Sequence, residues 1–256
     1  MSFKRTEAFV IRSFDINEAD KIIVFYSRAY GKLKGIARGS RKLKNRFGSS
    51  LELFTRVQVI LFEKETYTFP NISQADILES FSGLREDLHK LASAAYVVEL
   101  VDKGLGENEE SSRLYDLIAR TFRAIASSPE EETGKLLAAF EIKFLTLLGY
   151  QPVLDRCAHC QKALEPSRIL FSLSRGGGLC GECIGRGDPV FPTSLRALQV
   201  LKQFLKMDLE KSTRLRISEE VQREVKDLLR RWLDFYLEIS LKSPEFLDSV
   251  KKLAGR

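Results

Sequence analysis

The first quarter of the chain alternates in the manner of β-strands. Apolar and β-branched residues fill positions 8–11 and 22–26, and the polar stretch 15–20 separates the two runs. Residues 51–61 place Leu and Val at every second position for most of their length, which predicts a strand with one buried face. A further strand is predicted at 66–69, ending at Pro70.

Glycines at 31, 35, 39 and 48 punctuate the region between these runs, as expected for strand ends and turns, and the basic segment that begins at Gly35 resembles a strand that runs into a loop. Five short strands without a long helix suit a small barrel. A five-stranded oligonucleotide-binding (OB) fold over residues 1–78 is therefore the leading expectation.

From about residue 80 the hydrophobic period becomes helical. Three helices are predicted around 88–98, 114–125 and 137–148, and two more around 195–205 and 221–239, the last opened by Ser218 as N-cap. The acidic runs 107–110 and 130–132 are expected at helix starts, where carboxylates favour the helix dipole. The predicted class is α+β, with a helical domain over 79–256 that an insert at 152–190 interrupts.

Composition is that of a folded protein, with 44% hydrophobic and 30% charged residues. The chain shows no apolar run of membrane-spanning length, and its first residues lack the apolar core of a signal peptide. These features predict a cytoplasmic protein, associated with the nucleoid if it binds DNA, with no membrane partner.

Charge is concentrated in one segment. The net charge is only +6, yet residues 21–51 hold nine cations and no acid, so the rest of the chain is net acidic. Such a patch favours phosphate binding over a purely solubilising loop, since surface loops normally mix signs. The predicted DNA-binding cations are Lys21, Arg28, Lys32, Lys34, Arg38, Arg41, Lys42, Lys44 and Arg46.

Single-strand binding also needs faces on which bases can stack. Phe25 lies in an apolar run and is expected inside the barrel. Tyr30 and Phe47 have polar or charged neighbours and are the predicted stacking residues, with packing at the barrel rim as the alternative.

Two C-x₂-C pairs lie 19 residues apart: Cys157 with Cys160, and Cys180 with Cys183. Paired knuckles of this kind predict one structural Zn²⁺ held by four thiolates, with no open position for catalysis. A redox dithiol is the alternative, but it would not need a second copy. His159 lies inside a knuckle and is expected to face solvent.

The chain resembles the bacterial recombination mediator family RecO. The resemblance rests on residues 19–24 (ADKIIV), 30–32 (YGK), 37–41 (ARGSR) and 51–54 (LELF), and on 140–157 (FEIKFLTLLGYQPVLDRC). It implies an OB barrel, a helical domain with a zinc-binding insert, and a role in DNA repair and recombination. Some members lack the four cysteines, whereas this sequence retains them all.

The resemblance implies binding of single- and double-stranded DNA and annealing of complementary strands. It also implies partnership with RecR and with the acidic tail of single-strand-binding protein (SSB), and, indirectly, loading of RecA. Cations on helical segments that could contribute to the SSB contact are Arg123, Lys143, Arg196, Lys202 and Arg216.

Two other function classes remain to be weighed. An enzyme is not expected, because the chain has only two histidines and no metalloprotease, Walker or zinc-deaminase motif. A zinc-containing transcription or RNA-binding factor is the alternative, but it would carry its charge on the knuckles. Residues 152–190 are almost neutral, so the sequence favours DNA handling through the N-terminal patch.

Overall fold

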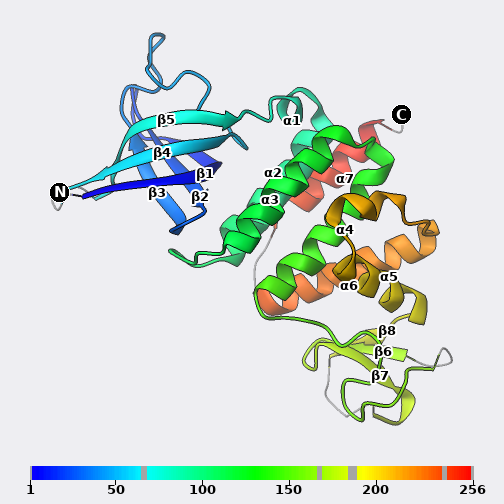
Figure 1. Cartoon of the computed structure of the whole chain (residues 1–256). Helices are drawn as coiled ribbons and strands as arrows, with labels where there is room; N and C mark the ends of the chain where they lie inside the picture. The colour runs from blue at the N-terminus through cyan, green and yellow to red at the C-terminus, as the bar shows by residue number, and fades with distance from the viewer. Residues whose placement is uncertain (1, 65–67, 166–168, 184–188, 238–240, 255–256) are drawn as a thin grey trace. The chain divides into compact units, whose positions relative to one another are not determined.

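A computed structural model describes residues 2–64, 68–165, 169–183, 189–237 and 241–254 (Figure 1). The chain divides into two compact units. Unit 1 contains residues 1–127 together with 241–256, and unit 2 contains residues 128–240. None of the helices in the described ranges is long and apolar enough to cross a membrane.

Unit 1 begins with five strands that form a closed barrel in the order β1-β2-β3-β5-β4. All neighbouring strands pair in antiparallel fashion except β3 and β5, which are parallel. The alternating runs explain this, because one face of each strand fills the barrel interior around Val10, Phe25 and Val59. The strands are β1 (Ser2–Asp15), β2 (Lys21–Ser27), β3 (Gly31–Ala37), β4 (Arg56–Glu63) and β5 (Asn71–Glu79).

Two predicted strands differ from those observed. The fourth strand begins at Arg56 rather than at residue 51, because residues 51–54 form turns and Phe54 adopts a left-handed φ of 71°. The strand predicted at 66–69 was wrong at Thr68 and Phe69, which form a bend, while residues 66 and 67 lie outside the described residues. The last barrel strand is instead β5, which follows Pro70.

Helices of unit 1 cover one side of the barrel. They are α1 (Gly83–Glu86), α2 (Leu88–Gly104), α3 (Ser112–Ser127) and α7 (Ser243–Ala254), which packs on α2. Asp87 caps α2 by accepting from the backbone N–H of Lys90. Five aromatic rings are buried between the barrel and the helices. The ring centroid of Phe122 on α3 lies within 5.6 Å of those of three neighbouring phenylalanines. The five rings are those of Phe9, Phe54, Phe81, Tyr115 and Phe122.

Unit 2 contains the remaining predicted helices and the insert. Its helices are α4 (Glu130–Leu147), α5 (Leu195–Lys206), the 3₁₀ segment η2 (Leu209–Arg214) and α6 (Glu219–Leu237). Glu130–132 lie in the first turn of α4, as predicted, and Ser218 caps α6 through the N–H of Val221. Residue 239 of the last predicted helix lies outside the described residues.

A small antiparallel sheet in the order β7-β6-β8 forms the core of the insert. Its elements are β6 (Ile169–Ser172), β7 (Gly177–Cys180), η1 (Gly181–Cys183) and β8 (Val190–Pro192). The buried Trp232 of α6 packs edge-on against Phe171 of β6, with ring centroids 5.1 Å apart. The insert is thereby fixed to α6 within unit 2.

The domain boundary predicted after residue 78 does not separate the two compact units, because it lies inside unit 1. The barrel and α3 belong to the same unit and share buried contacts such as that between Phe9 of β1 and Phe122 of α3. Glu107–110 precede α3 rather than starting it: Ser111 accepts from the N–H of Leu114 and the helix begins at Ser112. The sequence also gave no sign of α7, which returns from unit 2 to complete unit 1.

Candidate nucleic-acid interface and metal centre

Six of the nine predicted cations lie at one end of the barrel. Asp15 at the end of β1 pairs with Lys21, Lys21 pairs with Ala37 at the end of β3, and Asn71 opens β5 beside Ile36. The β3–β4 loop leaves from this same end. We call the six side chains the barrel-end cluster: Lys21, Arg38, Arg41, Lys42, Lys44 and Arg46.

Three arginines of the barrel-end cluster are fixed to the barrel. Arg38 donates to the side chain of Asn71 at 2.8 Å, Arg41 donates to the carbonyl of Asn17, and Arg46 donates to the carbonyl of Ile72 at 2.7 Å. The three arginines remain exposed, although Arg41 also lies 3.5 Å from the carboxylate of Asp15. Their positive charges are therefore held in defined places at the surface.

The tip of the β3–β4 loop is more open. Lys42 and Lys44 are exposed and form no salt bridge with the described residues, and Leu43 between them is fully exposed. Asp20 anchors the base of this loop by accepting from the N–H of Gly39 at 2.7 Å. That hydrogen bond and one from Asn17 lower the pKa of Asp20, so the anchor stays ionised.

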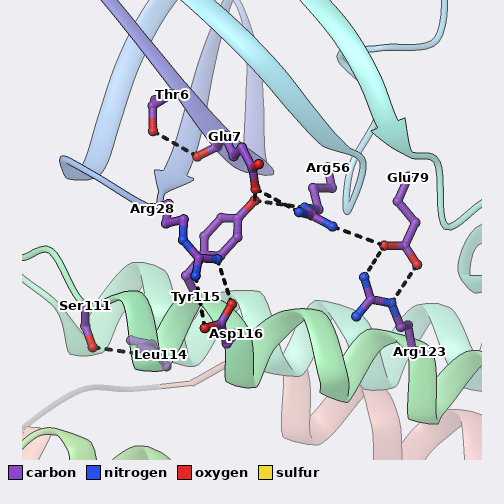
Figure 2. Close-up of polar contacts among 10 residues, drawn as sticks. All are labelled: Thr6, Glu7, Arg28, Arg56, Glu79, Ser111, Leu114, Tyr115, Asp116 and Arg123. Carbon is purple, nitrogen blue, oxygen red and sulfur yellow. Dashed lines mark hydrogen bonds and ion pairs between the residues drawn. The ribbon is translucent and has the colours of Figure 1, made fainter.

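The other three predicted cations, which we call the strand cluster, contact the helices of unit 1. Lys32 is largely buried and donates to the carbonyls of Asp102 and Leu105. Lys34 pairs with Glu107 at 2.5 Å. Arg28 pairs with both carboxylate oxygens of Asp116, at 2.7 and 3.2 Å (Figure 2).

The outer face of β2 and β3 is consequently covered. Val24 and Tyr26 lie outside the barrel core yet are 2% and 0% exposed. Burial raises the pKa of Tyr26 to about 12. Gly31 approaches the backbone of Glu109 so closely that a Cβ would lie 2.5 Å from it, which explains the glycine there. Residues 102–111 thus occupy the middle of the predicted surface.

Neither predicted stacking ring is free in this structure. Phe47 is 6% exposed and belongs to the barrel core, and Tyr30 is partly buried against that core with Lys4 over its ring. Charged sequence neighbours misled the prediction, because the loop turns Phe47 inward while Arg46 stacks over its ring at 4.7 Å. Tyr30 packs against the core, in agreement with the alternative of rim packing, whereas Phe47 lies in the core itself.

A polar network joins the barrel to α3 (Figure 2). Arg56 of β4 donates to Glu7 at 2.7 Å and to the hydroxyl of Tyr115 at 3.1 Å. Glu79 of β5 accepts two hydrogen bonds from Arg123 and lies 3.7 Å from Arg56. Arg123, a predicted partner-binding cation, is therefore engaged inside unit 1.

Other predicted helical cations also have contacts within unit 2. Lys143 donates to the carbonyls of Leu205 and Met207 at the end of α5, and Lys202 pairs with Asp155 at 3.0 Å. Lys143 is thus a helix C-cap. Arg196 lies on α5 and Arg216 lies between η2 and α6.

The four cysteines lie together in the insert. Their sulfurs are all within 4.8 Å of one another, and Cys160 Sγ is 3.7 Å from Cys180 Sγ. A tetrahedral Zn²⁺ with bonds of about 2.3 Å places its sulfurs about 3.8 Å apart, so the four sulfurs fit such an ion. His159 is exposed and its Nδ1 lies 2.5 Å from Arg175, outside the sulfur cluster.

Backbone N–H groups favour the ionised form of Cys157, which is the form that binds a metal ion. Burial opposes ionisation of Cys157, but N–H groups including that of Cys180, 3.4 Å away, lower its pKa to about 6. Burial and the surrounding thiols raise the pKa of Cys183 to about 12. Four thiolates at this spacing repel one another unless a metal ion neutralises them. The cluster can therefore bind a metal ion.

Comparison with known proteins matches both halves of the chain. Residues 1–81 match the family "Recombination protein O N terminal", and residues 85–245 match "Recombination protein O C terminal". The meeting point of the two matches lies close to the predicted boundary at residue 78.

Individual relatives agree over almost the whole length. The chain is 35% identical over 253 residues to the DNA repair protein RecO of Symbiobacterium thermophilum, which covers 98% of this chain and 99% of that protein. It is 36% identical over 248 residues to the DNA repair protein RecO of Pelotomaculum thermopropionicum, covering 97% and 94%. The chain therefore belongs to the RecO family of DNA repair proteins.

Proposed function

We propose that this protein binds DNA through the barrel-end cluster and promotes the annealing of complementary strands. The observation that carries the proposal is the gathering of six cations at one barrel end, of which five are exposed and Lys21 is half-buried. Each strand of DNA presents a row of phosphates, so a concentrated positive surface neutralises two backbones that otherwise repel each other. This activity needs no bond to be made or broken.

The barrel has the strand order and the parallel β3–β5 contact that suit an OB fold, and we propose that assignment for residues 1–78. The exposed Leu43 at the loop tip gives the basic surface an apolar side chain for contact with bases. Because the outer face of β2–β3 is covered, DNA is expected to run across the barrel end rather than across the middle of the sheet.

We further propose that the cysteine cluster holds one structural Zn²⁺. Cys157, Cys160, Cys180 and Cys183 would supply all four ligands, which leaves no position for a reacting water. The bound ion would join the turn after Leu154 to the β6–β7 hairpin. Its role is to hold the insert together.

Family membership supports a role alongside other recombination proteins. We propose that it acts at the nucleoid with RecR and with the C-terminal tail of SSB, and that it thereby helps RecA to load onto SSB-coated single strands. The support is the family membership and the DNA repair role of the relatives.

The salt dependence of DNA binding tests the proposal. For an oligo(dT) probe, the triple change Arg38→Ala, Arg41→Ala and Lys42→Ala should flatten the slope of log K against log salt by about 2, at ~0.7 per lost phosphate contact. A control triple, Lys206→Ala, Lys211→Ala and Arg214→Ala, removes the same charge from unit 2. An unchanged slope in the first triple contradicts the proposal.

Annealing is measured in the same proteins. Complementary oligonucleotides coated with SSB should anneal faster with the wild-type protein than without it, and the barrel-end triple should lose most of that acceleration. Equal rates with and without the wild-type protein would remove the annealing role.

A further inference from the structure

A groove within unit 1 lies beside the barrel-end cluster. It has a volume of about 830 Å³ and is lined by the end of β1, the β3–β4 loop, α1 and α2. Among its lining residues are Phe14, Lys21, Leu53 and Arg85. Ser40 and Asn45 also line it, and they bracket the loop tip that carries Lys42 and Lys44. A chain held by those lysines therefore passes the mouth of the groove.

Phe14 gives this groove an exposed aromatic ring. It is 41% exposed, although most large apolar residues of the barrel are buried. The guanidinium of Arg12 lies over the ring at 4.5 Å and is itself held by Asp102 at 2.6 Å. The ring is thus oriented by a fixed cation, and Leu53, 38% exposed, adds a second apolar edge to the groove.

Charges inside the groove favour a neutral guest. Lys21 lies 3.9 Å from Asp15, and Arg85 pairs with Glu52 at 2.9 Å, so the cations that line the groove stand beside carboxylates that also line it. A phosphate would meet these carboxylates, whereas a base carries no charge and can stack on the ring. The free positive charge lies on the loop outside.

We propose that this groove takes an unstacked base of single-stranded DNA, with the base stacked on Phe14 and its phosphates on the β3–β4 loop. The inference rests on the proposed DNA binding and adds the stacking residue that the barrel-end cluster lacks, since Phe47 and Tyr30 pack on the barrel. Asn45 uses its side-chain amide and carbonyl within its own loop, so the groove is expected to accept different bases.

Single-strand binding by Phe14 variants tests this inference. Phe14→Ala should weaken oligo(dT) binding about tenfold (~1.4 kcal/mol), as expected for the loss of one stacked base, and leave the salt slope unchanged because stacking releases no counterions. Phe14→Tyr should restore the affinity. Phe246→Ala is the matched control, because Phe246 is 43% exposed on α7 of the same unit.

An abasic oligonucleotide separates the base from the phosphates. Against that probe, Phe14→Ala and wild type should bind equally, and Phe14→Trp fluorescence should be quenched by oligo(dT) but not by the abasic strand. If Phe14→Ala binds oligo(dT) as wild type does while the barrel-end triple flattens the salt slope, the groove assignment is overturned and the proposed function stands. An unchanged slope in the triple overturns both.

Discussion

The hydroxyl of Tyr115 on α3 accepts a hydrogen bond from Nε of Arg56 on β4, at 3.1 Å (Figure 2). These two residues are 59 positions apart in the chain, and they connect the barrel to the helices of unit 1. Arg56 also reaches Glu7, and burial raises the pKa of Tyr115 to about 12, so the phenol stays protonated at neutral pH. The network is therefore a structural joint.

Tyr115→Phe is expected to weaken that joint by about 1.5 kcal/mol, at the lower end of the range for a hydrogen bond to a charged group. The ring contacts with Phe9 remain, and Arg56 keeps Glu7 as its partner. Urea denaturation should report the loss in the free energy of unfolding, while oligo(dT) affinity should stay the same. Reduced affinity at unchanged stability would instead assign the network to DNA binding.

A second joint lies at the C-terminal helix, where Glu99 of α2 accepts from the backbone N–H groups of Lys242 and Ser243. Burial opposes its ionisation, but hydrogen bonds from Lys103 and from this helix start lower its pKa to about 2. Because the pKa is lowered on folding, the ionised Glu99 stabilises the folded state at pH values above 4.5, the ordinary pKa of a glutamate. The contribution is lost as pH falls from there towards 2.

Glu99→Gln should therefore lower stability by about 1 kcal/mol at neutral pH, in the range of a lost helix cap, and flatten the acid limb of the stability curve between pH 5 and 2. Hydrogen exchange at Ser243 should become faster in this variant. Glu18→Gln, an exposed carboxylate of the same unit, is the control. An acid limb as steep as that of the wild type would show that Glu99 does not hold α7.

The sequence predicted the elements whose pattern is local. The apolar runs identified β1 and β2, and the helical period identified α2 to α6, because each buries one face along its own length. It misplaced β4 because Leu51 and Leu53 alternate like a strand while lying in turns. It missed α7, whose place on α2 depends on Glu99, 143 residues before Lys242.

The same limit applies to the sites. The four cysteines could be grouped from the sequence because two short knuckles determine the ligand set, and their sulfurs do come together. The basic segment was visible in the sequence as an excess of positive charge. Its division into the barrel-end cluster and the strand cluster could not be predicted, because the acids that pair with Arg28 and Lys34 lie more than 70 positions further along the chain. The exposure of the Phe14 side chain could not be predicted from the sequence, because it depends on where β1 ends.

Removal of the metal ligands tests the zinc assignment. Cys160→Ser with Cys183→Ser should abolish the single bound zinc expected from elemental analysis of wild type. The melting temperature should fall by ~2–8 °C, as a loss of 1–2 kcal/mol implies at this chain length. His159→Ala should keep its zinc, because His159 lies outside the sulfur cluster. Zinc retained by the double cysteine variant would contradict the four-thiolate site.

The strand cluster tests how far the proposed DNA surface extends. Arg28 and Lys34 were predicted to contact DNA, but in the structure they form ion pairs with Asp116 and Glu107. Both ion pairs are exposed: the side chains of Arg28 and Asp116 are 42% and 55% accessible, and those of Lys34 and Glu107 are 39% and 64%. Exposed pairs contribute only ~0–1 kcal/mol. Asp116→Asn with Glu107→Gln should therefore leave unfolding nearly unchanged while freeing two cations.

If those cations contact DNA, the double variant should bind oligo(dT) more tightly and steepen the salt slope by about 1.4, at ~0.7 for each phosphate gained. Glu220→Gln with Asp227→Asn removes two acids from α6 and controls for net charge. Tighter binding in both variants to the same extent would reflect net charge alone. A slope like that of wild type would confine the DNA surface to the barrel-end cluster, because Lys32 is already engaged by backbone carbonyls.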